Sequence, residues 1–309
     1  MNYAAGAAVS DLFAIFRVTT KQEIMDQRII NLFDEYTHKP LKREEFMKRL
    51  IKLTGSLTLA LSVLPLLEVN YAQAATVPED DKDLVLEDVT YPGDGATMKG
   101  YLARPKGKNK LGTVMVIHEN RGLNPHIKDV TRRMAKEGFV ALAPDALAPF
   151  GGTPANEETA REMFGKINAR QNLNNFLKGL DYLRSHPQGN KKTGAVGFCW
   201  GGAMVNQLAV NDPALNAAAA YYGRQPDAAD VPRIKAALLL HYGEMDERVN
   251  AGIPAYEAAL KAAGVNYELH VYKGAQHAFN TDTAPTRDNA EAAKLAWDRT
   301  IKLFNEKLK

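Results

Sequence analysis

The only cysteine of the 309-residue chain, Cys199, lies in the pentapeptide GFCWG at residues 197–201, between two apolar segments. This pattern has the form of a nucleophile elbow, a sharp strand-to-helix turn that exposes a nucleophile, with cysteine at the place of serine. The flanking glycines leave room for the crossing backbone. The following helix would point its N-terminus at the sulfur and favour the thiolate. The pattern predicts attack by Cys199 on a carbonyl carbon; the alternative is a buried structural cysteine at a helix start.

A thiol nucleophile needs a base, and the base needs a group that orients it. Asp246 and His277 each follow an apolar run and come after Cys199 in the order nucleophile, acid, histidine, which is the order of elbow-bearing hydrolases. Of the seven histidines, only His277 combines this order with a loop position; the alternative is a surface-loop histidine. Glu244 and Glu247 remain rivals of Asp246 for the acidic role.

The segment VIHENRGLNP, residues 116–125, follows an apolar strand at the place where this kind of fold completes its oxyanion hole. We expect the backbone N–H groups of Asn120 and Trp200 to hold the developing oxyanion. Glu119 would then lie beside the thiol and could hold its proton in the resting state. The alternative is that Glu119 only pairs with Arg121.

The composition narrows the class of protein. The chain has 39 basic and 36 acidic side chains and a net charge of +3, so it lacks the strong basic excess of a nucleic-acid-binding protein. One cysteine excludes an intramolecular disulfide, a CxxC redox pair and a cysteine-rich metal site. We therefore expect no nucleic-acid partner, and no metal or organic cofactor, since attack by Cys199 on the carbonyl of a small molecule needs neither.

The elements that must position these residues alternate from residue 83 onward. Residues 83–91 and 98–105 predict a leading hairpin. Further strands are expected at 112–120, 139–147, 193–199, 216–223, 236–246 and 266–275, and helices at 125–137, 156–186, 200–210, 254–264 and 286–308. Such alternation predicts an α/β fold, a mostly parallel, doubly wound sheet with helices on both faces, as a catalytic domain over residues 76–309. Chemistry in such folds gathers at the carboxyl ends of the strands.

Residues 1–75 differ from the rest. Within 41–74, a basic run precedes the mostly apolar residues 53–67 and the small-residue site 72–74, an order typical of a signal peptide. This segment would export the protein to the periplasm and be cleaved. However, Glu44 stands where a twin-arginine signal needs its second arginine, and the apolar run is shorter than the roughly 20 residues of a membrane span.

We favour instead an N-terminal helical leader that stays on a cytoplasmic protein, with export to the periplasm as the alternative. Residues 1–38 are expected to be a mixed helical stretch, and Met25 is a second candidate start. An amphipathic helix in this leader would dock on the catalytic body or on a partner subunit, which would allow a homo-oligomer. No integral membrane span is expected.

With these motifs in place, residues 83–309 resemble the dienelactone hydrolase (carboxymethylenebutenolidase) family. The segments GFCWGG, YYG, LLLHYGEMD and GAQHAFN match its pattern in order. The resemblance implies the α/β-hydrolase fold, a Cys199–Asp246–His277 triad, and Glu119 as the group that pairs with the thiol. The leader ending in NYAQA also resembles that of a bacterial branch of the family.

The chain departs from the family's pattern at the two arginines that hold the substrate carboxylate in dienelactone-specific members. Pro149 and Thr281 stand at these places. Arg121, Arg224 or Arg248 could substitute, and the alternative is that each is a surface arginine. The resemblance therefore implies ester or lactone hydrolysis and leaves the natural substrate open.

The leading hypothesis is a hydrolase that cleaves an ester or lactone through an acyl-enzyme on Cys199. The second is a thiol-based redox or stress sensor on a hydrolase scaffold, which would lack a resolving cysteine. The third is a non-catalytic protein whose leader mediates assembly.

Overall fold

A computed structural model describes residues 16–19, 22–39, 41–67, 76–282 and 287–309 of the chain. The chain forms two compact units, which are described separately below. One contains residues 1–70 together with 281–288, and the other contains residues 71–280 together with 289–309.

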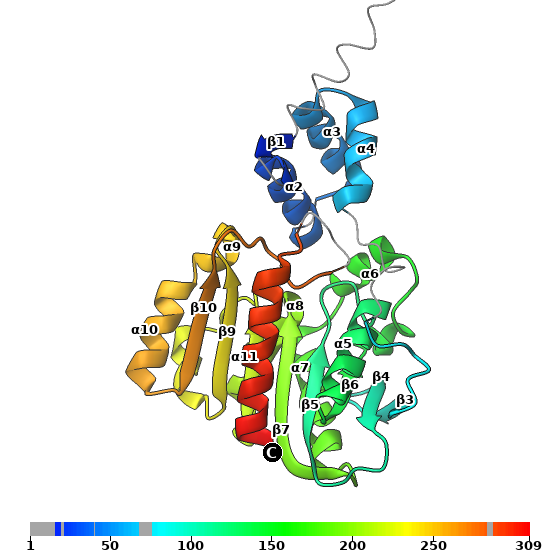
Figure 1. The fold of residues 1–309 in the computed structure, drawn as a ribbon, viewed down its shortest axis with the longest axis vertical. Helices are drawn as coiled ribbons and strands as arrows, with labels where there is room; N and C mark the ends of the chain where they lie inside the picture. The colour runs from blue at the N-terminus through cyan, green and yellow to red at the C-terminus, as the bar shows by residue number, and fades with distance from the viewer. Residues whose placement is uncertain (1–15, 20–21, 40, 68–75, 283–286) are drawn as a thin grey trace, which may run out of the picture. The chain divides into compact units, whose positions relative to one another are not determined.

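The larger unit is built on one sheet of eight strands in the order β10-β9-β8-β7-β5-β6-β4-β3 (Figure 1). The strands are β3 (Leu84–Pro92), β4 (Thr97–Pro105), β5 (Leu111–Ile117), β6 (Val140–Pro144), β7 (Gly189–Phe198), β8 (Ala217–Tyr221), β9 (Ala237–Gly243) and β10 (Tyr267–Tyr272). The pairs among β5 to β10 are parallel, whereas β3–β4 and β4–β6 are antiparallel. The predicted hairpin and the mostly parallel sheet are confirmed.

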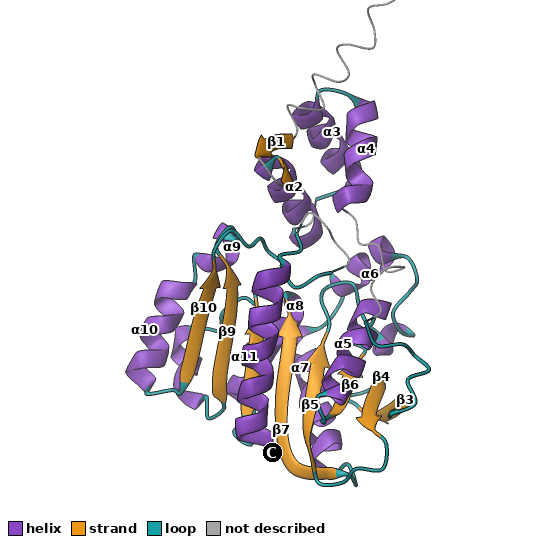
Figure 2. Ribbon diagram, in the orientation of Figure 1, coloured by secondary structure: helices purple, strands orange, loops and turns teal. Residues whose placement is uncertain are grey.

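Helices cover both faces of this sheet (Figure 2). They are α5 (Pro125–Lys136), α6 (Glu157–Phe164), α7 (Ala169–Arg184), α8 (Trp200–Asn211), α9 (Glu247–Asn250), α10 (Ile253–Ala263) and α11 (Ala290–Leu308), with short 3₁₀ turns at Ala148–Phe150 and Ala228–Arg233. The two faces follow from strand alternation. In β5, Val114 and Val116 pack with α5 and α11, whereas Met115 and Ile117 pack with α7, α8 and α10.

The stretch 156–186, in which one or two helices are expected, forms two, α6 and α7, because the side chain of Asn168 caps a new helix by accepting from Gln171 N–H. One predicted helix boundary changes. The last helix begins at Ala290 rather than at residue 286. The side chain of Asn289 accepts from Ala292 N–H and so fixes this start.

The smaller unit contains β1 (Phe16–Thr19), β2 (Gln22–Met25), α2 (Gln27–His38), α3 (Arg43–Thr54) and α4 (Leu57–Leu67). Residues 1–38 were expected to be a mixed helical stretch; Gln27–His38 is helical, whereas β1 and β2 pair as antiparallel strands. The helices share one apolar core, in which Ile29 and Phe33 of α2 pack with Leu50 of α3 and Val63 of α4.

The apolar run of the predicted signal segment does not form one helix. Helix α3 ends at Gly55, whose φ of +83° reverses the chain, and α4 starts two residues later. No single helix within the described ranges has the length and hydropathy of a membrane span; only α3 and α4 taken together do, and they meet at a bend of 111°. The predicted cleavage site at 72–74 lies outside the described residues.

The smaller unit also includes chain from near the C-terminus. Arg287 forms an ion pair with Asp34 of α2 at 2.8 Å, and its guanidinium lies 4.9 Å from the ring centroid of Phe33. Arg287 is buried. This unit is therefore assembled from two segments that are distant in sequence.

Candidate active site

The GFCWG segment forms the strand–turn–helix arrangement expected for a nucleophile elbow. Strand β7 ends at Phe198, Cys199 forms the turn, and α8 begins at Trp200. Cys199 has φ 54° and ψ −112°, a backbone conformation that is rare and strained for a residue with a Cβ atom. Because Cys199 directly precedes α8, the first N–H groups of this helix, which have no partner within the helix, point toward its surroundings.

The two flanking glycines are required by sterics. A Cβ atom on Gly197 would lie 2.3 Å from the carbonyl oxygen of Gly201, and one on Gly201 would lie 2.3 Å from that of Ile117. Both clashes are with backbone atoms, so no side-chain rotation could relieve them. The spacing of glycines that suggested the elbow is thus a consequence of how closely β5, β7 and α8 approach one another.

We expect Gly201→Ala to reduce the free energy of unfolding by about 3 kcal/mol or more, because overpacking against backbone forces whole elements apart. Urea denaturation would measure this loss. Gly107→Ala is the matched control, since a Cβ there meets nothing within 4 Å and only its φ of +71° is unfavourable; it should cost about 1 kcal/mol. Equal losses in the two variants would contradict the steric argument.

Cys199 is more buried than expected for an elbow nucleophile. Its exposed fraction is 7%, because it packs in a cluster with Tyr222, Ala278 and Phe279 from the ends of neighbouring strands. The surroundings are not purely aliphatic, because a ring nitrogen of His277 lies within 4.8 Å of the sulfur.

Asp246 and His277 meet at the carboxyl ends of β9 and β10. His277 donates from Nδ1 to Oδ2 of Asp246 at 2.5 Å, and Oδ1 of Asp246 accepts from Val249 N–H at 3.2 Å. Asp246 caps helix α9, so its position is fixed by the backbone. The rival Glu244 is exposed and accepts from Gly274 N–H. The carboxylate paired with His277 is therefore that of Asp246.

The electrostatics of this cluster favour a protonated His277. Burial by itself would lower the pKa of His277, which has an exposed fraction of 2%. The negative charges of Cys199 and Asp246 outweigh burial and raise this pKa to about 10. Burial would raise the pKa of Asp246, but the charge and hydrogen bond of His277 hold it below its usual value.

Tyr222 is a neighbour of the cluster that the sequence reasoning did not single out. Its ring lies 5.0 Å from that of His277 in an edge-on contact, and its φ is +39°. The positive φ lets the chain turn after β8 so that the ring faces His277. In the sequence, Tyr222 belongs to the segment YYG, which matches the family's pattern but indicates no role for this ring.

The loop after β5 carries the other predicted residues. Oε1 of Glu119 is buried and finds no hydrogen-bond partner within the residues that the structure describes. Arg121 forms an ion pair with Glu157 of α6 at 3.3 Å. Asn120 follows Glu119 in this loop, and Trp200 is the first residue of α8.

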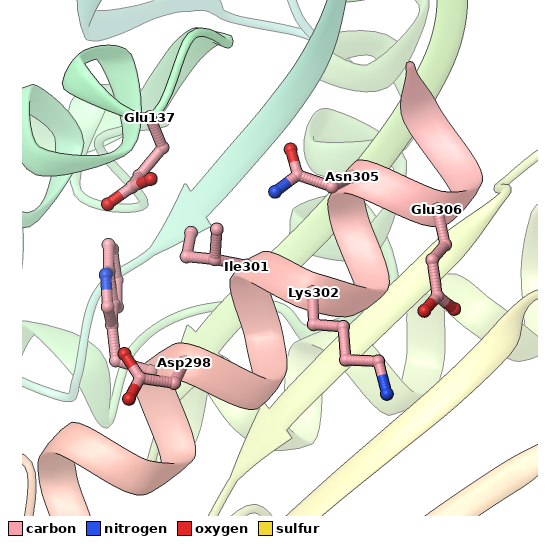
Figure 3. Close-up of a pocket in the computed structure, with 7 residues that line it drawn as sticks. Glu137, Asp298, Ile301, Lys302, Asn305 and Glu306 are labelled. Atoms are coloured by element: carbon pink, nitrogen blue, oxygen red, sulfur yellow. The ribbon is translucent and has the colours of Figure 1, made fainter.

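Neither of the other candidate arginines is placed in this cluster. Arg224 and Arg248 are exposed; Arg248 contributes to the lowered pKa of Asp246 through its charge. A surface groove of about 500 Å³ lies elsewhere, between the end of α5 at Glu137 and the α11 residues Trp297, Asp298 and Ile301 (Figure 3). It contains none of the residues singled out above.

Comparison with known proteins identifies the family. Residues 98–308 match the model of the dienelactone hydrolase family. A Synechocystis protein named "Putative carboxymethylenebutenolidase" is 34% identical over 239 residues, which cover 72% of this chain and 96% of that protein.

Solved structures agree with this match. A dienelactone hydrolase-like promiscuous phosphotriesterase from metagenomic libraries is 25% identical, covers 74% of this chain and 100% of its own, and has a TM-score of 0.66. A dienelactone hydrolase of Anabaena variabilis has the same fold, with 22% identity, a TM-score of 0.58, and coverage of 74% and 100%. The chain therefore belongs to the dienelactone hydrolase family and is a hydrolase of lactone or carboxylic ester bonds on an α/β-hydrolase fold.

Proposed function

We propose that the enzyme cleaves a lactone or carboxylic ester through a thioester on Cys199, with His277 as the proton carrier and Asp246 as the group that orients it. The observation that carries this proposal is the ordered contact chain. Asp246 holds Nδ1 of His277 at 2.5 Å, and a ring nitrogen of His277 lies within 4.8 Å of the sulfur of Cys199. These three side chains fit the roles of acid, base and nucleophile.

The reaction has two halves. The thiolate of Cys199 forms a C–S bond to the carbonyl carbon, and the carbonyl oxygen becomes an oxyanion. Collapse of this intermediate breaks the C–O bond, and the leaving oxygen takes a proton from His277. Water then gives a proton to His277 and its hydroxyl to the acyl carbon. The C–S bond breaks and the carboxylic acid leaves. Acylation by a plain ester is expected to be slow, because thiolate leaves the tetrahedral intermediate more readily than an alkoxide does.

Two further roles belong to the loop after β5. The N–H groups of Asn120 and Trp200 are proposed as the donors to the oxyanion, since Trp200 begins α8, where N–H groups have no partner within the helix. Glu119 is proposed to hold the thiol proton in the resting enzyme. Its buried Oε1 finds no hydrogen-bond partner among the described residues, which supports such a role.

Two arginines are proposed to bind the rest of the substrate. Arg121 is kept as a proposed substrate-binding residue, although its charge is already paired with Glu157, and Arg224 as a second. Because Arg121 is paired, we favour a substrate without a carboxylate over a dienelactone; a panel of neutral and anionic lactones would decide this.

Residues 1–75 are proposed to be an N-terminal helical leader or signal-like segment, and residues 76–309 the catalytic domain. Leu57 and Leu61 of α4 are exposed, which supports homo-oligomerisation through this segment. Light scattering on the full chain would test it. The comparisons give no support to a thiol-based redox role, because the relatives named above are hydrolases.

Trapping the acyl-enzyme tests the proposed function. The protein is mixed with p-nitrophenyl acetate, quenched in acid during the first turnover, and its intact mass is measured. We expect one added acetyl group in the wild-type protein, located on the peptide that contains Cys199, and none in Cys199→Ala. Release of p-nitrophenol by Cys199→Ala at the wild-type rate would exclude the proposal.

A further inference from the structure

His118 joins the proposed oxyanion loop to a neighbouring strand end. It directly follows β5 and is fully buried. Its Nδ1–H donates to the carbonyl oxygen of Glu119 at 2.6 Å, and its Nε2 accepts from Ala146 N–H at 3.1 Å. One ring nitrogen donates and the other accepts, so these two bonds select the neutral ring with its proton on Nδ1. Burial also lowers the pKa of His118 and so keeps the ring neutral.

The same ring contacts the start of helix α8. His118 stacks on Trp200 with ring centroids 5.5 Å apart and planes only 10° from parallel. Phe164 packs edge-on against both rings, at 5.6 Å from His118 and 5.0 Å from Trp200. His118 therefore contacts four separate segments, namely the loop after β5, the loop after β6, the end of α6 and the first residue of α8.

The other end of the loop after β5, at Leu123, is also held by the segment that follows β6. Oγ1 of Thr153 accepts from Leu123 N–H at 2.9 Å and donates to Oδ1 of Asp145 at 2.8 Å. Asp145 also accepts from the N–H groups of Leu147 and Thr153, so its position is fixed by backbone. The segment after β6 thus holds both ends of the loop that carries Glu119 and Asn120.

We propose that His118 is a positioning residue that sets the distance between the backbone N–H groups of Asn120 and Trp200. The inference rests on the proposed function, in which these two groups bind the oxyanion. One side chain is bonded to the carbonyl just before Asn120 and stacked on the ring of Trp200. A shift of about 1 Å between such donors can cost about 100-fold in rate. His118 contributes no proton, because both its nitrogens are engaged with the backbone.

The test compares two reactions of Cys199 in the full chain. Acylation by an ester develops an oxyanion, whereas alkylation by iodoacetamide occurs at a saturated carbon and develops none. His118→Phe keeps a ring for stacking and loses both hydrogen bonds. We expect this variant to lower kcat for p-nitrophenyl acetate about 10- to 100-fold, with KM and the rate of alkylation close to wild type.

His241→Phe is the matched control. His241 is also fully buried and bonded through both nitrogens, to Tyr272 Oη and Thr300 Oγ1, but outside the proposed oxyanion loop. It should lose stability without a change in kcat per folded molecule. A folded His118→Phe with kcat within about twofold of wild type would overturn the proposal. A parallel loss of acylation and alkylation would also overturn it, since that indicates a general structural role.

A second variant keeps the proposal testable if His118→Phe does not fold. Thr153→Val retains the shape of the side chain and removes the bridge between Leu123 and Asp145. It should also slow acylation and leave alkylation unchanged, and acylation at the wild-type rate would count against the proposal. Failure of the proposed function itself has a different signature, because Cys199→Ala would then still turn over esters.

Discussion

Replacement of Cys199 by alanine is expected to lower kcat for an ester or lactone by about 10⁶-fold, the scale at which loss of the nucleophile acts in a triad hydrolase. No other thiol exists in the chain, so none could take over the attack. His277→Ala should cause a loss of similar size, and the double variant should lose little more, because residues that act as one unit are not additive. Initial rates with an enol lactone and p-nitrophenyl acetate would measure these losses.

The control for these variants is His270→Ala. His270 lies in β10, the strand that precedes His277 in the chain. It bonds to Glu268, and its side chain is partly exposed. It should retain activity. Wild-type turnover in Cys199→Ala or His277→Ala would remove the thiol mechanism, provided that circular dichroism shows a folded protein. Equal losses in His270→Ala and His277→Ala would mean that the assay reports folding rather than chemistry.

Replacement of Asp246 by asparagine is expected to lower kcat by about 10⁴-fold while the fold persists. The amide keeps the shape of the side chain and can still accept from Val249 N–H, which preserves the start of α9. It removes the negative charge that helps to raise the pKa of His277 to about 10. The pKa of His277 should therefore fall in the variant, because the imidazolium loses a stabilising neighbour. NMR titration of the ring would measure this shift.

Glu244→Gln is the matched control for Asp246→Asn. Glu244 is close in sequence, but its carboxylate accepts from Gly274 N–H and is exposed. We expect almost no change in kcat or in the pKa of His277. If Glu244→Gln lost activity and Asp246→Asn kept it, Glu244 rather than Asp246 would be the carboxylate that orients His277.

The elbow shows how far local sequence could predict the site. A strained residue between a strand and a helix needs glycines where the backbones cross, and the clashes calculated for Gly197 and Gly201 are the physical basis of that pattern. The alternation of strands and helices along the chain predicted the parallel sheet equally well. Side chains on a strand face opposite sides in turn, so a fully apolar run indicates a strand that is buried on both faces. Both signals can be read from the sequence, although only the clash at Gly197 is with a residue nearby in the chain, whereas that at Gly201 is with Ile117 of β5.

Other features required the folded chain. Sequence order allowed Glu244, Asp246 or Glu247 as the acid. The choice depends on which carboxylate reaches His277 in the loop after β10. Glu119 was expected either to pair with Arg121 or to face the thiol, whereas Arg121 pairs with Glu157 of a distant helix. His118 precedes the elbow and so falls outside the order nucleophile, acid, histidine, and its contacts with Ala146 and Trp200 cannot be read from the sequence.

The sequence by itself thus determined the elbow at Cys199, the histidine that could serve it and the α/β class, because glycine spacing, residue order and side-chain periodicity can be read along the chain without knowledge of distant contacts. Only the tertiary structure decided that Asp246 is the partner of His277, that His118 stacks on Trp200, and that Arg287 pairs with Asp34. Those contacts join residues far apart in the chain, and their energies depend on distances that exist only once the sheet and its loops have packed.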